Sequence, residues 1–280
     1  MKLRRRGVMG SFLREASLLI FAALWAAPFY LLISGSLRTT EEIYKAPFGL
    51  PTSLNVSSFG TAWSFIQMPT LPRALLNTAI MTVGTVIVLI LLSAICAYVI
   101  ARRSGWFAIG VYGMFLLAMA LPGQVGFISV YMWLNQLGLL GTYAGVIVAN
   151  VAGYLPMAVF LYTGFFRALS PDYEEASYMD GASRTRTFFR VVFPQLRAVT
   201  GTLTILVGIF TWNEFFTPLI ILSGTENVPV TVTLYQFMGN IYSDWSVVFA
   251  VILIAMAPAM ALFAIGQKYL IKGFTGGIKG

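Results

Sequence analysis

The sequence predicts an all-α integral membrane protein with six transmembrane helices. Hydrophobic residues make up 58% of its 280 residues and charged residues only 10%, whereas a soluble domain carries about 25% charged residues. The few charged residues gather in short clusters between long apolar runs. Because a helix needs roughly 20 apolar residues to cross the hydrocarbon layer, each run is long enough to be a span.

Runs free of Asp, Glu, Lys and Arg define the helices in order along the chain. Residues 16–37 and 74–101 are the first two runs. The uncharged stretch 104–166 is too long for one helix, and we expect the polar and glycine residues at 135–141 to form a turn that divides it. Two further runs follow, the first interrupted only by Glu214. The expected spans of this single domain, 1–280, are residues 16–37, 74–101, 106–133, 142–166, 198–222 and 245–267.

The basic residues predict the orientation of the chain. With the N-terminus inside, all of the 18 Lys and Arg residues except Arg38, Lys45 and Arg73 lie on the cytoplasmic side. Cytoplasmic loops carry an excess of Lys and Arg, so both termini are predicted to be inside (N-in/C-in). The basic N-terminus is also typical of a signal peptide, but no small-residue cleavage site ends the apolar run, and we expect a retained first span.

Several kinds of chemistry are absent from the sequence. It has no histidine and no metal-ligand cluster, and its single cysteine, Cys96, lies in an apolar run. None of its lysines is followed by Ser or Thr, so it has no P-loop for ATP. Its net charge of +8 belongs to loop clusters rather than to a nucleic-acid-binding face. We expect no catalytic residue, metal or cofactor in this chain, and no nucleic-acid partner. Any uphill step would need an ion gradient or a separate ATPase.

The loop at residues 168–195, between the fourth and fifth spans, has the pattern of two short helices. Ser170 is a helix cap and Pro171 suits the first helical position, and acidic residues follow in the first turns. Gly181 interrupts the helix. A basic amphipathic helix follows and is expected to end at Pro194. Such an element fits a groove on a soluble partner or lies on lipid headgroups, and the residues alone leave both open.

The motifs of this loop carry a resemblance. Glu175-Ala176-Ser177 is followed by Asp180-Gly181-Ala182 and then by Pro194. This pattern resembles the loop of binding-protein-dependent ABC importer permeases, and Ser177 in place of a third small apolar residue is a mild departure. The chain as a whole is similar to the shorter permease of the maltose-type carbohydrate importers. The similarity includes Arg73 and Asn77, Leu121-Pro122, Trp212-Asn213-Glu214 and residues 267–280.

The resemblance implies a subunit, not an enzyme, that moves a carbohydrate through a bacterial or archaeal cytoplasmic membrane. It implies as partners a second permease subunit, two ATPase subunits that hold ATP and Mg, and an extracytoplasmic solute-binding protein. The first helix of the loop would be the coupling helix, which docks into the ATPase, and the tail 268–280 would reach the same partner. The residues expected to dock are Glu175, Ala176, Ser177, Asp180, Gly181, Ala182, Lys272 and Lys279.

Polar residues in or near the spans are candidates for a sugar path, because sugars need hydrogen-bonding groups beside aromatic faces. An ionisable residue such as Glu214 is costly inside a membrane and marks a path or a partner. Polar residues also join membrane helices, so Glu214 has the alternative of pairing with Arg73 or Arg38, and Asn77 of anchoring the second span. The candidates are Asn77, Gln124, Asn150, Tyr154, Asn213 and Glu214.

Two other functions remain open at this stage. An ion-coupled secondary transporter is one, although six helices are few for a fold that usually contains two related halves. A membrane scaffold that docks a soluble partner through the loop 168–195 is the other.

Overall fold

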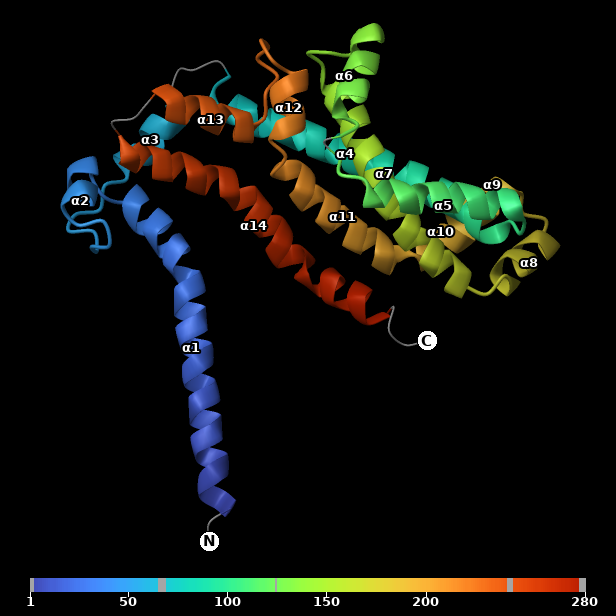
Figure 1. Cartoon of the computed structure of the whole chain (residues 1–280), viewed down its shortest axis with the longest axis horizontal. Coiled ribbons are helices and arrows are strands. Elements are labelled where there is room, and N and C mark those ends of the chain that lie inside the picture. The colour runs from blue at the N-terminus through green and yellow to red at the C-terminus, as the bar shows by residue number, and fades with distance from the viewer. Residues whose placement is uncertain (1–2, 65–68, 124, 241–243, 277–280) are drawn as a thin grey trace. The chain divides into compact units, whose positions relative to one another are not determined.

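The computed structural model describes residues 3–64, 69–123, 125–240 and 244–276, and every regular element within them is a helix (Figure 1). The chain divides into two compact units. The first contains Met1–Leu71 and Leu234–Met256, and the second contains Pro72–Thr233 and Ala257–Gly280.

The first unit begins with the long apolar helix α1 (Leu3–Ser36), followed by α2 (Thr40–Lys45) and α3 (Ser57–Ser64). Thr39 and Glu42 form a capping box at the start of α2. The buried Arg38 side chain donates to the backbone carbonyls of Glu42, Ala46 and Pro47, which closes the turn around α2. Arg38 is therefore a structural residue of this unit, and its guanidinium donates to backbone carbonyls rather than to a carboxylate.

Asp244 caps the last long helix, α14 (Trp245–Gly276), and ties it to α2. Its Oδ1 accepts from the hydroxyls of Thr40 at 2.7 Å and Ser246 at 2.6 Å. Burial raises the pKa of Asp244, but these bonds and those from the backbone N–H groups of Ser246 and Val247 outweigh it, so the pKa lies below its usual value.

The second unit surrounds the helix α7 (Tyr143–Ala168). Helices α4 (Leu71–Arg102), α5 (Trp106–Ala120) and α11 (Arg197–Trp212) supply the rest of its core. Tyr162 and Phe166 of α7 are fully buried there, because apolar side chains on one stripe of each helix face the neighbouring helices. The short helices α6 (Phe127–Gln136) and α12 (Phe216–Ile221) complete this part of the unit, together with the beginning of α13 (Val230–Asn240).

Four helices in the described residues are long and apolar enough to cross a membrane: Phe12–Ser36, Leu71–Arg102, Tyr143–Ala168 and Trp245–Gln267. The pair Arg184–Gln195 and Arg197–Trp212, bent by 76°, raises the number to five if it is one span. The shorter α5 is apolar as well. The expectation of six uninterrupted spans therefore differs from the structure at two places.

The third expected span, 106–133, is divided between α5 and α6. Helix α5 ends before Leu121-Pro122, because proline lacks an N–H donor and disfavours helical angles in the residue before it. The fifth, 198–222, is divided between α11 and α12 at Asn213. The Asn213 side chain bonds back to the carbonyl of Ile209 at 2.8 Å, and the Glu214 carboxylate accepts from the N–H of Thr217 at 3.1 Å. These polar side chains cap two helix ends where the prediction had one helix.

Candidate functional site

The loop 168–195 begins with α8 (Asp172–Met179), which ends in a Schellman motif. The N–H of Ala182 donates to the carbonyl of Ser177 at 3.1 Å, and that of Gly181 to Tyr178 at 3.0 Å. Gly181 has a φ of +78°, which side chains other than glycine rarely adopt. No heavy atom lies within 4 Å of the place where a Cβ would stand, so the outer side of this bend is open.

Helix α8 has an inner and an outer face. Glu174 and Ser177, three residues apart, are buried, whereas Glu175, Ala176 and Asp180 are exposed. The Ser177 hydroxyl lies 2.9 Å from that of Thr187 in α9 (Arg184–Thr187), which holds the two halves of the loop together. Ser177 thus serves the loop from inside, unlike the docking role expected of it. The other expected residues of the motif lie outward, with Ala182 half-buried.

Glu174 and Arg102 form a buried ion pair that the sequence did not predict. Arg102 Nε lies 2.6 Å from Glu174 Oε1, and the Tyr98 hydroxyl donates to Oε2 at 2.7 Å. The side chains are only 18% and 9% exposed. The other guanidinium nitrogens of Arg102 donate to the carbonyls of Phe166 at 2.9 Å and Leu169 at 3.0 Å, at the end of α7. One side chain therefore joins α4, α7 and α8.

The second half of the loop is held by aromatic packing. It comprises α9, the π-helix η1 (Phe188–Val192) and α10 (Phe193–Gln195). The ring of Phe188 lies 5.1 Å from that of Tyr98 and 6.4 Å from that of Phe166. The helix continues one residue past Pro194, where it was expected to end, and the chain bends at Leu196.

A cleft of about 440 Å³ in the second unit is the other candidate site. It brings together three of the expected path residues, Asn150 and Tyr154 from α7 and Glu214 from the break between α11 and α12. Phe127 and Phe216 also line it, with their rings 5.0 Å apart. Amide, phenol and carboxylate groups beside aromatic rings suit a ligand rich in hydroxyl groups.

Asn150 is the most informative residue of this cleft. It is 5% exposed, and its Nδ2 has no hydrogen-bond partner among the described residues. Buried polar groups are normally paired, so an unpaired donor in a cleft suggests a bound molecule or water. The Tyr154 hydroxyl interacts with the Glu214 carboxylate beside it. Gln124 lies outside the described residues, although Gly123 and Gly126 line the cleft.

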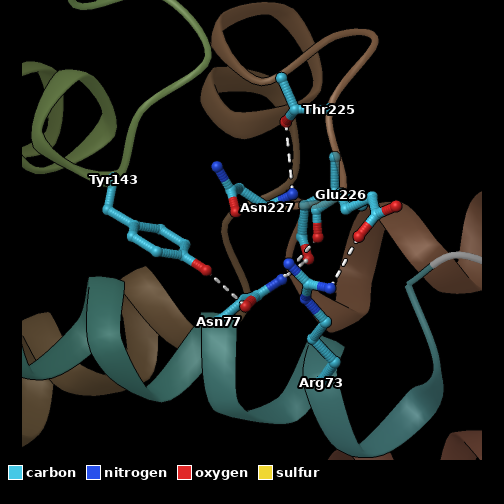
Figure 2. Close-up of polar contacts among 7 residues, drawn as sticks. Arg73, Asn77, Tyr143, Thr225, Glu226 and Asn227 are labelled. Atoms are coloured by element: carbon cyan, nitrogen blue, oxygen red, sulfur yellow. Dashed lines mark hydrogen bonds and ion pairs between the residues drawn. The ribbon is translucent and has the colours of Figure 1, made fainter.

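Asn77 belongs to a separate polar cluster on the connection between α12 and α13 (Figure 2). It is 1% exposed, and its Nδ2 donates to the carbonyls of Glu226 at 3.0 Å and Val228 at 2.9 Å. Its Oδ1 accepts from the Tyr143 hydroxyl at 2.7 Å. With both donor hydrogens used, Asn77 anchors this connection, and it does not line the cleft of Asn150 and Tyr154.

Arg73 pairs with Glu226 at 2.7 Å in the same cluster, and both side chains are 48% exposed. The alternative in which Arg73 pairs with Glu214 is thus not what the structure contains. Asn213 is exposed and caps α11 without lining the cleft. Lys279 and the side chain of Lys272 lie outside the described residues. Within the described residues, no group of His, Cys, Asp and Glu is placed to hold a metal.

Comparison with known proteins agrees with this geometry. Residues 89–276 match the sequence family of binding-protein-dependent transport system inner membrane components. The melibiose/raffinose/stachyose import permease MelC of Bacillus subtilis is 32% identical over 93% of this chain and 94% of its own length. The diacetylchitobiose uptake system permease NgcG of Streptomyces coelicolor is 27% identical over 94% and 87%.

The fold has a counterpart among solved structures. A chain of a bacterial ABC transporter involved in the import of the acidic polysaccharide alginate superposes with a TM-score of 0.83. The superposition covers 95% of this chain and 98% of the other at 22% sequence identity.

Proposed function

The chain belongs to the inner membrane components of binding-protein-dependent transport systems, and on this premise we propose that it carries a carbohydrate through the membrane as one permease subunit of an ATP-driven importer. It is a multi-pass transport subunit rather than an enzyme. The observation that carries the proposal is its similarity, over nearly the whole chain, to permeases named for oligosaccharide import. Its cargo is a disaccharide, an oligosaccharide or a related polyol.

The partners follow from the loop 168–195. Its outer face presents Glu175, Ala176, Asp180 and Gly181, while its inner face is fastened to α4 and α7. We assign the outer face to docking on an ATPase subunit that holds ATP and Mg. Glu175 would form charge-assisted hydrogen bonds there, which are stronger than neutral ones. A second permease, a second ATPase subunit and an extracytoplasmic binding protein complete the complex, and the basic tail 268–280 reaches toward the ATPase.

Purification of the tagged chain from its native membrane in mild detergent tests this assembly. We expect mass spectrometry to find an ATPase subunit and a second permease with the wild-type chain. Glu175→Ala should lose most of the ATPase and keep the second permease, because we assign the outer face of α8 to the ATPase alone. Asp172→Asn, an exposed change on the same helix, should keep both. A wild-type chain that purifies alone would refute the importer complex.

Six crossings with both termini inside remain our proposal for the topology. Helix α5 has 15 residues and is about 22 Å long at 1.5 Å per residue, too short for a layer of about 30 Å, so we assign α5 and α6 together to the third crossing. Helices α11 and α12 make up the fifth. The basic residues then lie on the cytoplasmic side of a bacterial or archaeal cytoplasmic membrane.

Thiol labelling of intact cells tests this topology. In a Cys96→Ala background, a membrane-impermeant maleimide should label Ser53→Cys from outside and should label Thr185→Cys only after the cells are opened. Both positions are exposed in the structure. Labelling of Thr185→Cys in sealed cells would reverse the proposed orientation.

The cleft of Asn150, Tyr154 and Glu214 is our candidate for part of the sugar path. Gly153 lines it, and a Cβ there meets no heavy atom within 4 Å, so Gly153→Cys fits without disturbance. In opened cells, where the maleimide reaches both sides of the membrane, transported sugar should slow the labelling of Gly153→Cys. Gly164→Cys, equally open but away from the cleft, should not respond to sugar. If sugar changed the labelling rates of Gly153→Cys and Gly164→Cys equally, the cleft would not be part of the sugar path.

A further inference from the structure

The ion pair of Arg102 and Glu174 fastens the loop 168–195 to the ends of α4 and α7. Its side chains are 18% and 9% exposed, so water screens the pair little. Arg102 uses Nε for the carboxylate and its two terminal nitrogens for the carbonyls of Phe166 and Leu169. The guanidinium fork suits this task because it holds several acceptors in fixed directions, which a lysine cannot do.

This arrangement joins the ends of α4 and α7 to α8, beside the aromatic packing of Phe188 on Tyr98 and Phe166. Three residues, Leu169, Ser170 and Pro171, separate α7 from α8. Arg102 donates to two carbonyls at the end of α7, where the Phe166 carbonyl also accepts from the N–H of Leu169 at 3.3 Å, and its charge favours this helix end. Glu174 points inward from α8, one position before the exposed Glu175. Thus the two neighbouring acids serve opposite faces of one helix.

Helix α7 connects this fastening to the cleft. Tyr154 precedes Phe166 by 12 residues, which is about 18 Å along a helix. The α7 segment between them packs against α4 and α11 and contains Pro156, where the helix lacks one backbone hydrogen bond. The wall that carries Asn150 and Tyr154 therefore belongs to the same helix as the end that Arg102 holds.

We propose that Arg102 and Glu174, supported by Tyr98, are positioning residues that make α8 move as one body with the ends of α4 and α7. Through them, a push on α8 by the ATPase changes the cleft. This inference rests on the function proposed above, since it requires an ATPase on the outer face of α8. Without the ion pair, the ATPase moves α8 relative to α4 and α7, and the shape of the cleft does not change.

The test measures the accessibility of the cleft rather than sugar transport, so the substrate need not be known. The purified complex carries Cys96→Ala and Gly153→Cys, and the rate of maleimide labelling is compared without nucleotide and with ATP and vanadate. We expect the nucleotide to change this rate about fivefold or more. In Arg102→Gln and in Glu174→Gln, the change should be lost while the ATPase stays bound and hydrolyses ATP.

Three further variants make the result specific. The double variant Arg102→Gln/Glu174→Gln should be no worse than either single change, since both remove one interaction. Arg167→Gln is the matched control, because Arg167 lies at the same end of α7 but its guanidinium stacks on Tyr112 at 4.8 Å. It should keep the nucleotide response. Arg102→Lys keeps the charge but cannot reach three acceptors, and we expect it to lose most of the response.

A full nucleotide response in Arg102→Gln or Glu174→Gln would overturn the proposal. If neither variant enters the membrane, the nucleotide response is measured in Arg102→Lys instead. A wild-type response in Arg102→Lys would also overturn the proposal. A parallel loss of ATPase binding in these variants would show that the pair only shapes α8, and would also overturn it. Failure of the proposed function itself looks different, because then no ATPase accompanies the wild-type chain.

Discussion

Gly181→Trp is expected to abolish sugar uptake while the chain remains in the membrane at its normal level. The backbone of Gly181 is in the left-handed region, with a φ of +78°, so any L side chain adds strain of about 1–2 kcal/mol. This cost alone does not unfold a domain. A Cβ at this position has no heavy atom within 4 Å, so the indole extends from an open side of the bend into the surface that we assign to the ATPase. The ATPase should then either hydrolyse ATP without driving sugar transport or fail to bind this chain at all.

The control for this change is Gly181→Asn. Asparagine tolerates the left-handed region and is much smaller than tryptophan, so it preserves both the Schellman motif and most of the outer surface. Uptake of the transported sugar and ATPase activity of the complex are measured for both variants. Uptake by Gly181→Trp at the wild-type rate would show that the outer side of this bend has no partner.

Asn77→Leu is expected to lower the free energy of unfolding of the second unit by about 2 kcal/mol, because it removes the partner of the buried Val228 carbonyl and of the partly buried Glu226 carbonyl and Tyr143 hydroxyl. The connection between α12 and α13 then keeps only its remaining bonds to α4, those of Arg73 with Glu226 and of Thr78 with Val230. The midpoint of thermal aggregation of the purified chain in detergent reports this loss. Leucine has a similar size, so the polar bonds are the main difference.

Arg73→Ala is the matched control in the same cluster. Its pair with Glu226 is half exposed, and such surface ion pairs contribute about 0–1 kcal/mol. The midpoint should therefore shift little in this variant. Equal shifts in Asn77→Leu and Arg73→Ala would contradict the assignment of Asn77 as the buried anchor.

The local features of this chain could be predicted from its sequence. The apolar runs, the positive residues between them and the motif around Gly181 each depend on a short stretch of chain. Hydropathy needs about 20 consecutive residues, and the Schellman motif needs only its own turn. These rules predicted the helical membrane class and the two-helix loop. They missed the breaks after α5 and α11, where Pro122 and the caps at Asn213 and Glu214 end helices inside apolar runs.

By itself the sequence determined that this is a helical membrane protein with a two-helix loop at 168–195, because hydropathy, charge and turn chemistry act between near neighbours. Tertiary structure alone decided which polar residues meet. Glu174 finds Arg102 from 72 residues away, and Asn77 finds the carbonyls of Glu226 and Val228 from about 150. Burial makes these pairs strong, since an unpaired polar group inside the protein is costly. No local pattern marks them, however, because any of several acids or amides satisfies the same local rules until packing brings the helices together.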